Sequence, residues 1–364
     1  MSFSRVKDQT VAMRLLSSII RKGRIPSGLL LWGPDGVGKR LAAFEMAKAV
    51  NCLDAKGDAC DVCLSCRKAI SGNHPDIKMI VPAGKARMIK VDTVEDMNQT
   101  TAFRPFEGRR RIFIIEEADR MNESAQNHFL KTLEEPASPT LFVLVTSHPR
   151  ALLPTIRSRC QSVRFGSLRV ETVTDLLIRQ RGVDPAVADA AAALSQGQMS
   201  RALDLVESDR RRMVLEVIDR LRRGEDPLLV GEWFTAYLLK VEAEITAAVK
   251  AGSDTDDDTG ASGEESRDER RGKEELEAEV AGRMRKERYE LVYLFQAWYR
   301  DVLVYATTND ASRVLNRDRI NDLTPAAGAN HAAKLEALDT AWLYLERNLN
   351  PGRVFRDLFF ALAG

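Results

Sequence analysis

The chain lacks the features that would place it in a membrane or on nucleic acid by bulk charge. No apolar run approaches the roughly 18 residues that a membrane span needs, and residues 1–10 contain no apolar signal segment. The 54 Lys and Arg residues nearly balance the 53 Asp and Glu residues, which excludes a strongly basic nucleic-acid coat. With only 5 cysteines in 364 residues, a disulfide framework is not expected. We therefore expect a cytoplasmic protein of two or three domains that makes no membrane contact.

The N-terminal half carries the signals of an α/β nucleotide-binding fold. Short apolar runs of strand length alternate with segments of helical periodicity, and the clearest runs are residues 28–32, 112–115 and 141–145. Fully apolar runs beside helical sequence are typical of parallel strands that helices cover on both faces. The first run enters a glycine-rich turn and then a helix, which is the usual opening of such a fold.

The C-terminal half is predicted to be helical. Strand signals stop near residue 169, and the helices beyond it carry large apolar side chains, including Trp233, Phe234, Trp298 and Trp342. These side chains are expected to form the core of a helical bundle, with subunit contacts as the alternative. Residues 251–275 contain no apolar side chain larger than alanine and cannot bury enough surface to offset their ordering entropy. The sequence therefore predicts a disordered, charged insertion at about residues 251–282.

A phosphate-binding loop follows the first predicted strand. Residues 33–40 read Gly-Pro-Asp-Gly-Val-Gly-Lys-Arg and match the pattern G-x-x-x-x-G-K. In this pattern the loop around Gly33, Gly36 and Gly38 presents backbone N–H groups to phosphate oxygens, and Lys39 reaches the β- and γ-phosphates. The pattern normally ends in Ser or Thr, whose hydroxyl binds Mg²⁺. Arg40 cannot replace that hydroxyl, because a guanidinium carries only donors and a positive charge.

The acidic residues after the second strong strand run also depart from an ATPase pattern. Glu116 stands where a metal-binding aspartate is usual, and Glu117 stands at the position of the water-polarising base of AAA+ ATPases. The extra methylene displaces the Glu116 carboxylate, and position errors of about 1 Å can cost a hundredfold in rate. We therefore expect poor Mg²⁺ binding and slow or absent ATP hydrolysis. Binding of ATP or ADP stays open.

Four cysteines lie within fifteen residues. Cys52, Cys60, Cys63 and Cys66 have the spacing C-x7-C-x2-C-x2-C, which provides four soft ligands on a chain that can fold back on itself. This arrangement predicts a closed, structural zinc site. Four reduced structural cysteines are the alternative, and a redox C-x-x-C motif is less favoured. His74 lies nearby at a predicted strand entry and is left out of the metal shell.

The order of these motifs resembles that of bacterial DNA polymerase III clamp-loader subunits of the gamma/tau and delta-prime type. After the phosphate loop and the cysteines come His-Pro-Asp at 74–76, Ala-Asp-Arg-Met-Asn at 118–122, Leu-Lys-Thr-Leu-Glu-Glu-Pro at 130–136 and Ser-Arg-Cys at 158–160. The resemblance extends over residues 8–205. It implies an AAA+ P-loop core with a parallel sheet at 1–166, including a zinc module at 52–66, a small helical lid at 167–208 and a C-terminal helical collar domain at 209–364.

The resemblance also implies a role and partners. Such subunits form a five-membered ring with gamma/tau and delta partners, and the ring loads a sliding clamp onto primer–template DNA. The Ser-Arg-Cys motif would place Arg159 against the γ-phosphate held by a neighbouring motor subunit, as an arginine finger acting in trans. A local helix cap or ion pair is the alternative role of Arg159. Thr146 and Arg201 stand at the positions of the two nucleotide sensors.

Three functions are distinguished by these residues. Arg40 and Glu116 favour a non-motor subunit of the delta-prime type, which is part of the DNA polymerase III holoenzyme without being a polymerase. An ATP-hydrolysing motor of the gamma/tau type should keep Ser or Thr and Asp at these two positions. An unrelated P-loop ATPase with a zinc module would not carry the motifs at 130–136 and 158–160.

Overall fold

The computed structural model describes residues 2–54, 57–83, 87–253, 265–323 and 330–364. The chain divides into two compact units. The first comprises Met1–Thr172 with Gly197–Ser200, and the second comprises Val173–Gln196 with Arg201–Gly364. Each unit has its own buried core.

A parallel sheet forms the centre of the first unit. Its strands are β1 (Gly28–Trp32), β2 (Ile77–Ile80), β3 (Arg111–Ile115), β4 (Thr140–Thr146) and β5 (Gln161–Arg164). They lie in the order β2-β3-β4-β1-β5, and every neighbouring pair is parallel. Because all strands run the same way, the segments that follow β1, β3 and β4 meet at one edge of the sheet.

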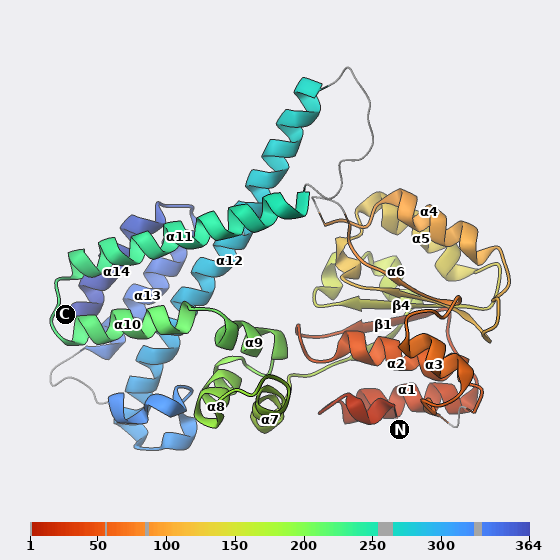
Figure 1. Ribbon diagram of the computed structural model, residues 1–364, viewed down its shortest axis with the longest axis horizontal. Helices are drawn as coiled ribbons and strands as arrows, with labels where there is room; N and C mark the ends of the chain where they lie inside the picture. Colours follow the sequence, from red (N-terminus) through yellow and green to blue (C-terminus); the bar gives the residue numbers. More distant parts are fainter. Residues whose placement is uncertain (1, 55–56, 84–86, 254–264, 324–329) are drawn as a thin grey trace. The chain divides into compact units, whose positions relative to one another are not determined.

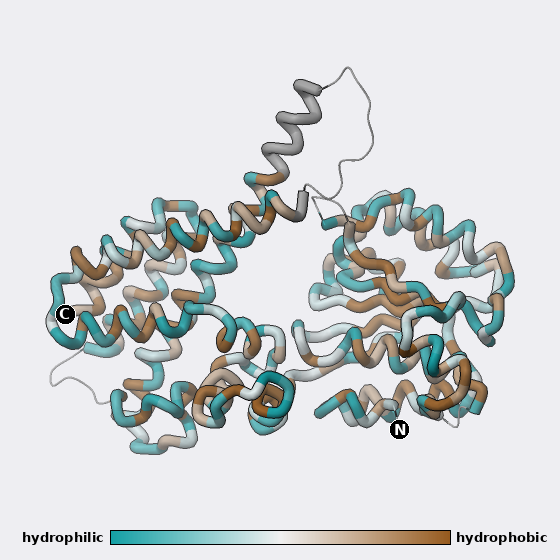
Figure 2. The backbone as a smooth tube through the Cα atoms, in the orientation of Figure 1, coloured by the Kyte–Doolittle hydropathy of each residue, from teal (hydrophilic) through white to brown (hydrophobic). Residues whose placement is uncertain are grey.

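Helices cover both faces of this sheet (Figure 1). One face carries α4 (Val91–Thr101), α5 (Glu123–Glu134) and α6 (Pro154–Arg159), and the other carries α1 (Thr10–Lys22), α2 (Lys39–Asn51) and α3 (Leu64–Ile70). On the first face, Phe113 stacks on Phe142 at 5.4 Å, and Phe129 meets Phe142 edge-on at 5.0 Å between ring centroids. The central strands β1, β3 and β4 are buried along nearly their whole length, and their apolar runs are visible in Figure 2, which confirms the prediction of buried parallel strands for these three runs. Short 3-10 helices complete the unit: η1 (Phe3–Arg5), η2 (Ala118–Arg120) and η3 (Pro149–Ala151).

A buried carboxylate organises the loop before β3. Asp76 accepts hydrogen bonds from the backbone N–H groups of Phe106, Glu107 and Gly108 at 2.7, 2.8 and 2.7 Å. Its Oδ1 lies 3.7 Å from the Arg111 guanidinium. Burial alone would raise the pKa of Asp76, but these N–H groups and Arg111 together lower it below its ordinary value. The Asp of the His-Pro-Asp motif therefore holds the loop against β2.

Asp76→Asn is expected to destabilise the first unit by about 2–4 kcal/mol at neutral pH, because an amide offers one oxygen and no charge to three N–H donors. The folded-state pKa is depressed, so the stabilisation is complete above the unfolded value of about 3.9 and is lost as the pH falls through the folded value. Urea unfolding at several pH values should show that the difference in the free energy of unfolding between wild type and variant becomes smaller in acid. The control is Asp96→Asn, which changes an exposed aspartate. An equal loss of unfolding free energy in both variants would contradict the role of Asp76 in holding the loop.

The second unit is helical throughout its described residues. Its helices are α7 (Val170–Arg181), α8 (Pro185–Leu194), α9 (Met199–Glu207), α10 (Arg210–Arg222), α11 (Pro227–Ser253), α12 (Glu265–Thr308), η4 (Ala311–Arg313), η5 (Arg317–Asp322), α13 (His331–Glu346) and α14 (Pro351–Ala363), of which α7 and α9 begin within residues assigned to the first unit. Phe234 lies at the centre of an aromatic cluster, with ring centroids 4.9 Å from Phe355 and 5.2 Å from Phe359. Trp298 is also buried. These two predicted apolar residues therefore belong to the core of the bundle. No helix among the described residues has both the length and the apolar character that crossing a bilayer requires.

The predicted disordered insertion at 251–282 is wrong for its second part. Helix α12 already begins at Glu265, and α11 continues to Ser253. Residues 254–264 lie outside the described part of the chain. The composition argument excluded a buried core but not a helix, because Glu, Lys, Arg and Ala have high helix propensity even where nothing packs on them. The predicted division into core, lid and collar stays a prediction, since most of residues 167–208 group with the C-terminal helices.

Candidate functional site

The phosphate loop connects β1 to α2 and contains three glycines whose backbone φ angles are positive. Gly33, Gly36 and Gly38 have φ values of 150°, 70° and 95°. At Gly36 a side chain would also collide with the chain, because a Cβ atom would lie 2.4 Å from the backbone nitrogen of Ser200. Gly36 accepts a hydrogen bond from the N–H of Met199 at 3.3 Å. The glycine pattern is therefore required by the backbone, as the motif predicts.

Lys39 lies inside this loop. Its ammonium donates to the carbonyl oxygens of Gly33 and Pro34, both at 2.6 Å, and lies 3.5 Å from Asp35. The side chain is only 6% exposed. Burial lowers the pKa of Lys39, and the Asp35 carboxylate partly offsets that effect. The loop thus holds one buried cation at the N-terminus of α2.

Arg40 and Glu116, the two departures from the ATPase pattern, contact one another. The Nε atom of Arg40 lies 2.7 Å from Oε1 of Glu116. The Glu116 side chain is 15% exposed and follows β3, while Arg40 is 68% exposed at the start of α2. Burial raises the pKa of Glu116, and the Arg40 charge opposes this shift. An ion pair therefore lies where a hydroxyl and an aspartate would normally share a metal ion.

Glu117 also has cationic partners. Its carboxylate accepts a hydrogen bond from Arg87 at 2.6 Å and lies 3.5 Å from the Nε atom of Arg120. Its backbone has φ 44° and ψ 50°, an uncommon conformation for a residue with a side chain. Both guanidiniums therefore engage the Glu117 carboxylate, at the position where a water-polarising base would need a free oxygen.

Thr146, at the end of β4, points into the same edge of the sheet. It is buried, donates to the carboxylate of Asp119 and accepts from the backbone N–H of His148 at 2.9 Å. Asp119 lies in the Ala-Asp-Arg-Met-Asn motif, and nothing in the sequence indicated a role for this aspartate. The structure thus brings Lys39, Arg40, Glu116, Glu117 and Thr146 to the C-terminal ends of β1, β3 and β4.

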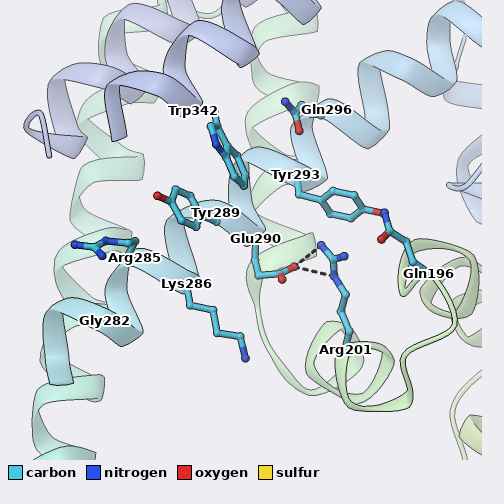
Figure 3. Close-up of a pocket in the computed structure, with 10 residues that line it drawn as sticks. All are labelled: Gln196, Arg201, Gly282, Arg285, Lys286, Tyr289, Glu290, Tyr293, Gln296 and Trp342. Atoms are coloured by element: carbon cyan, nitrogen blue, oxygen red, sulfur yellow. Dashed lines mark hydrogen bonds and ion pairs between the residues drawn. The ribbon is translucent and has the colours of Figure 1, made fainter. Parts of the chain in front are cut away.

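Arg201 has partners in the second unit. Its guanidinium donates to Glu290 at 3.0 and 2.8 Å and lies 3.8 Å from the centre of the Tyr293 ring. These three residues line a cavity of 560 Å³, in which Tyr289 also stacks on Trp342 at 4.3 Å (Figure 3). The sequence identified Arg201 from a short sensor-like string and could not indicate Glu290 or Tyr293, which lie far away along the chain.

Arg159 ends α6 and is partly exposed. Its Nε atom forms an ion pair with Glu134, and its NH1 group donates to the carbonyl oxygen of Thr155 at 3.1 Å. Glu134 belongs to the Leu-Lys-Thr-Leu-Glu-Glu-Pro string at the end of α5. Next to it, Cys160 is buried, and a Cβ atom on Gly28 would lie 2.8 Å from its sulfur. The two family strings therefore lie side by side and hold one arginine at the surface.

The four clustered cysteines have the geometry of a metal centre. Their sulfur atoms all lie within 4.8 Å of one another. The separations are 3.9 Å from Cys52 to Cys63 and 4.0 Å from Cys60 to Cys66. A tetrahedral zinc site with Zn–S bonds of about 2.3 Å needs sulfur separations of about 3.8 Å. The four thiols therefore fit a closed, structural zinc site. His74 instead accepts from the N–H of Asp76 at 3.2 Å and lies 3.1 Å from Ser65, which agrees with leaving it out of the shell.

Backbone N–H groups around the cysteines favour thiolates. Cys63 accepts from the N–H of Cys66 at 3.5 Å, and Cys60 accepts from that of Cys63 at 3.3 Å. Burial opposes ionisation of Cys63, but these and neighbouring hydrogen bonds lower its pKa to about 7. Burial raises the pKa of Cys52 and Cys66, so a bound cation would be needed to keep them ionised.

The cysteine segment is also anchored to the N-terminal region. The carboxylate of Asp58 accepts from the N–H of Phe3 at 3.1 Å, and Ser17 donates to the carbonyl oxygen of Gly57 at 2.7 Å. On the other side, the fully buried Lys48 of α2 lies 2.5 Å from Asp61 and 2.6 Å from Glu45. The cluster therefore connects η1, α1 and α2.

The sheet order and the phosphate loop at its C-terminal edge define a P-loop protein of the AAA+ class, with a second, helical unit. Residues 8–169 match the family described as DNA polymerase III, delta subunit. The DNA polymerase III delta' subunit of Bacillus subtilis is 32% identical over 65% of this chain and 73% of its own length. The chain belongs to this family of clamp-loader subunits.

Other relatives match over shorter stretches. The delta' subunit of Pseudomonas aeruginosa is 39% identical over 36% of this chain and 40% of its own length. The gamma/tau subunit of Mycobacterium tuberculosis is 33% identical over 50% of this chain, so the chain spans only 32% of that relative. A solved gamma subunit-related protein of Thermotoga maritima is 20% identical, with coverage of 98% and 99% and a TM-score of 0.42.

Proposed function

We propose that this chain is the delta-prime subunit of a DNA polymerase III clamp loader and hydrolyses little or no ATP itself. It would act in the cytoplasm with gamma/tau and delta subunits to load the sliding clamp onto primed DNA. The observation that carries the proposal is the Arg40–Glu116 ion pair at 2.7 Å, because the residues that normally ligate Mg²⁺ are both replaced. The pairing of Glu117 with Arg87 and Arg120 supports it further.

The same proposal assigns Arg159 the role of an arginine finger for a neighbouring motor subunit. Its support is the partly exposed position of the side chain and its place in the Ser-Arg-Cys motif. The four cysteines would hold a structural zinc ion, since their spacing fits tetrahedral thiolate coordination. Zinc would fix the loop after α2 and take no part in chemistry.

A motor of the gamma/tau type is the second candidate, because a gamma/tau relative is 33% identical over 186 residues. ATP turnover by the purified chain separates the two. We expect turnover far below the value on the order of 1 s⁻¹ that a working motor reaches, and a rate of that order would favour the motor. Reconstitution with gamma/tau and delta partners then tests the assembly: the complex should load clamps onto primed DNA only when this chain is present.

A further inference from the structure

The divalent cation that P-loop ATPases use does not fit this site. Mg²⁺ requires near-octahedral oxygen ligands, normally including the P-loop hydroxyl and an aspartate. Here Arg40 supplies a guanidinium, which has no lone pair to offer a metal ion. Its Nε atom lies 2.7 Å from the carboxylate that would be the second protein ligand. A cation brought to Glu116 would therefore have to displace a fixed positive charge.

The two replacements form a matched pair. With Arg40 absent, the mostly buried Glu116 carboxylate would lose the cation nearest to it. With Glu116 absent, Lys39 and Arg40 would be two adjacent cations at the start of α2, and among the described residues Asp35 would be the one carboxylate at ion-pair distance from either of them. The Arg40–Glu116 pair is neutral, whereas a divalent cation with one carboxylate carries a net positive charge, so Lys39 is the further cation beside the pair.

Arg40 keeps its phosphate-binding capacity while paired. Arg40 approaches Glu116 through Nε, and among the described residues no hydrogen bond or ion pair joins its guanidinium to any other residue. The side chain is 68% exposed. The terminal amines form the planar fork that binds phosphate oxygens in pairs. They adjoin the loop of Gly33, Gly36 and Gly38, which retains the backbone conformations that present N–H groups to phosphates.

We propose that this loop binds the phosphates of a nucleoside di- or triphosphate without a divalent cation, with Arg40 in the place of the metal ion. Glu116 orients the guanidinium, and Lys39 supplies the second cation. The inference rests on the proposed non-hydrolysing function, because a site built this way retains nucleotide without activating it. The nucleotide would then stay bound as a permanent component of the first unit. It would not change between a triphosphate and a diphosphate during a cycle of hydrolysis.

Calorimetric titration of the purified, nucleotide-stripped chain with ADP and with ATP tests this directly. Each titration is made with excess MgCl₂ and again with excess EDTA. We expect saturable binding in both conditions, with dissociation constants that differ by less than about twofold. Binding that requires MgCl₂, or no binding in either condition, would overturn the proposal.

Two variants and one control assign the effect to Arg40. Arg40→Ala should weaken ADP binding in EDTA by roughly tenfold or more, because charge-assisted hydrogen bonds to phosphate are lost. The double variant R40T/E116D restores the usual metal ligands and should make binding depend on MgCl₂. Arg14→Ala, which removes an exposed arginine of α1, should change neither constant. An unchanged ADP affinity in Arg40→Ala would contradict the proposal. Circular dichroism verifies that each variant is folded.

The outcome is separable from that of the proposed function. These titrations use the chain alone, so they do not depend on partners, on clamp loading or on Arg159. Failure of metal-independent binding would leave the clamp-loader role standing. Conversely, failure to assemble with gamma/tau and delta would not explain a change in the MgCl₂ dependence of ADP binding.

Discussion

Replacing Arg159 by alanine is expected to remove one fast ATP-hydrolysing site from each reconstituted clamp-loader complex. An arginine supplied in trans stabilises the charge that develops on the transferred phosphoryl group and contributes roughly 10³–10⁵ in rate. The site that this chain faces should therefore slow by roughly 10³-fold or more. Sites between other subunits would keep their rates. Single-turnover hydrolysis with primed DNA and clamp present resolves the two populations.

Two further variants make this test specific. Arg157→Ala removes an exposed arginine of the same helix, two residues away, and should leave the fast phase intact. Arg159→Lys keeps the charge but loses the planar fork, so it should behave like the alanine variant. Loss of the Glu134 ion pair costs on the order of 0–1 kcal/mol because both side chains are well exposed, so misfolding is not expected. An unchanged fast phase in Arg159→Ala would exclude the finger.

Cys66→Ser is expected to abolish zinc binding and to lower the stability of the first unit. A ligand that binds only the folded state, at a free concentration a thousandfold above its dissociation constant, contributes about 4 kcal/mol. Removal of zinc by a chelator should have a similar effect on the wild type. Metal content measured by mass spectrometry, together with the midpoint of thermal unfolding, provides the readout.

The fifth cysteine provides the matched control. Cys160 is buried like Cys66 but lies beside Gly28 of β1 and does not belong to the four-cysteine cluster, and burial raises its pKa to about 12. Cys160→Ser should therefore retain one zinc ion per chain even if packing suffers. A wild-type chain without zinc, or a Cys66→Ser chain that retains it, would show that the four thiols are merely reduced packing residues. Loss of the metal should also loosen the contacts of Asp58 with Phe3 and of Gly57 with Ser17.

The local patterns of the sequence predicted much of the first unit. Apolar runs identified β1, β3 and β4 because strands that are buried on both faces need no polar alternation. The short strand β2 and the edge strand β5 are mostly exposed or half-buried, so periodicity gave little signal for them. In the second unit, composition alone was misleading: residues 265–282 have little to bury, yet they continue a long helix.

The sequence by itself determined which side chains are present: a glycine-rich loop with Lys39, four cysteines at metal-binding spacing, and Arg40 and Glu116 in place of metal ligands. Only the tertiary structure decided what these side chains contact. Three ion pairs join residues that lie far apart in the chain: Arg40 with Glu116, Glu117 with Arg87, and Arg201 with Glu290. Such contacts depend on the order of strands in the sheet and on the packing of helices. Local periodicity carries no information about either, because it reports only which face of an element is buried.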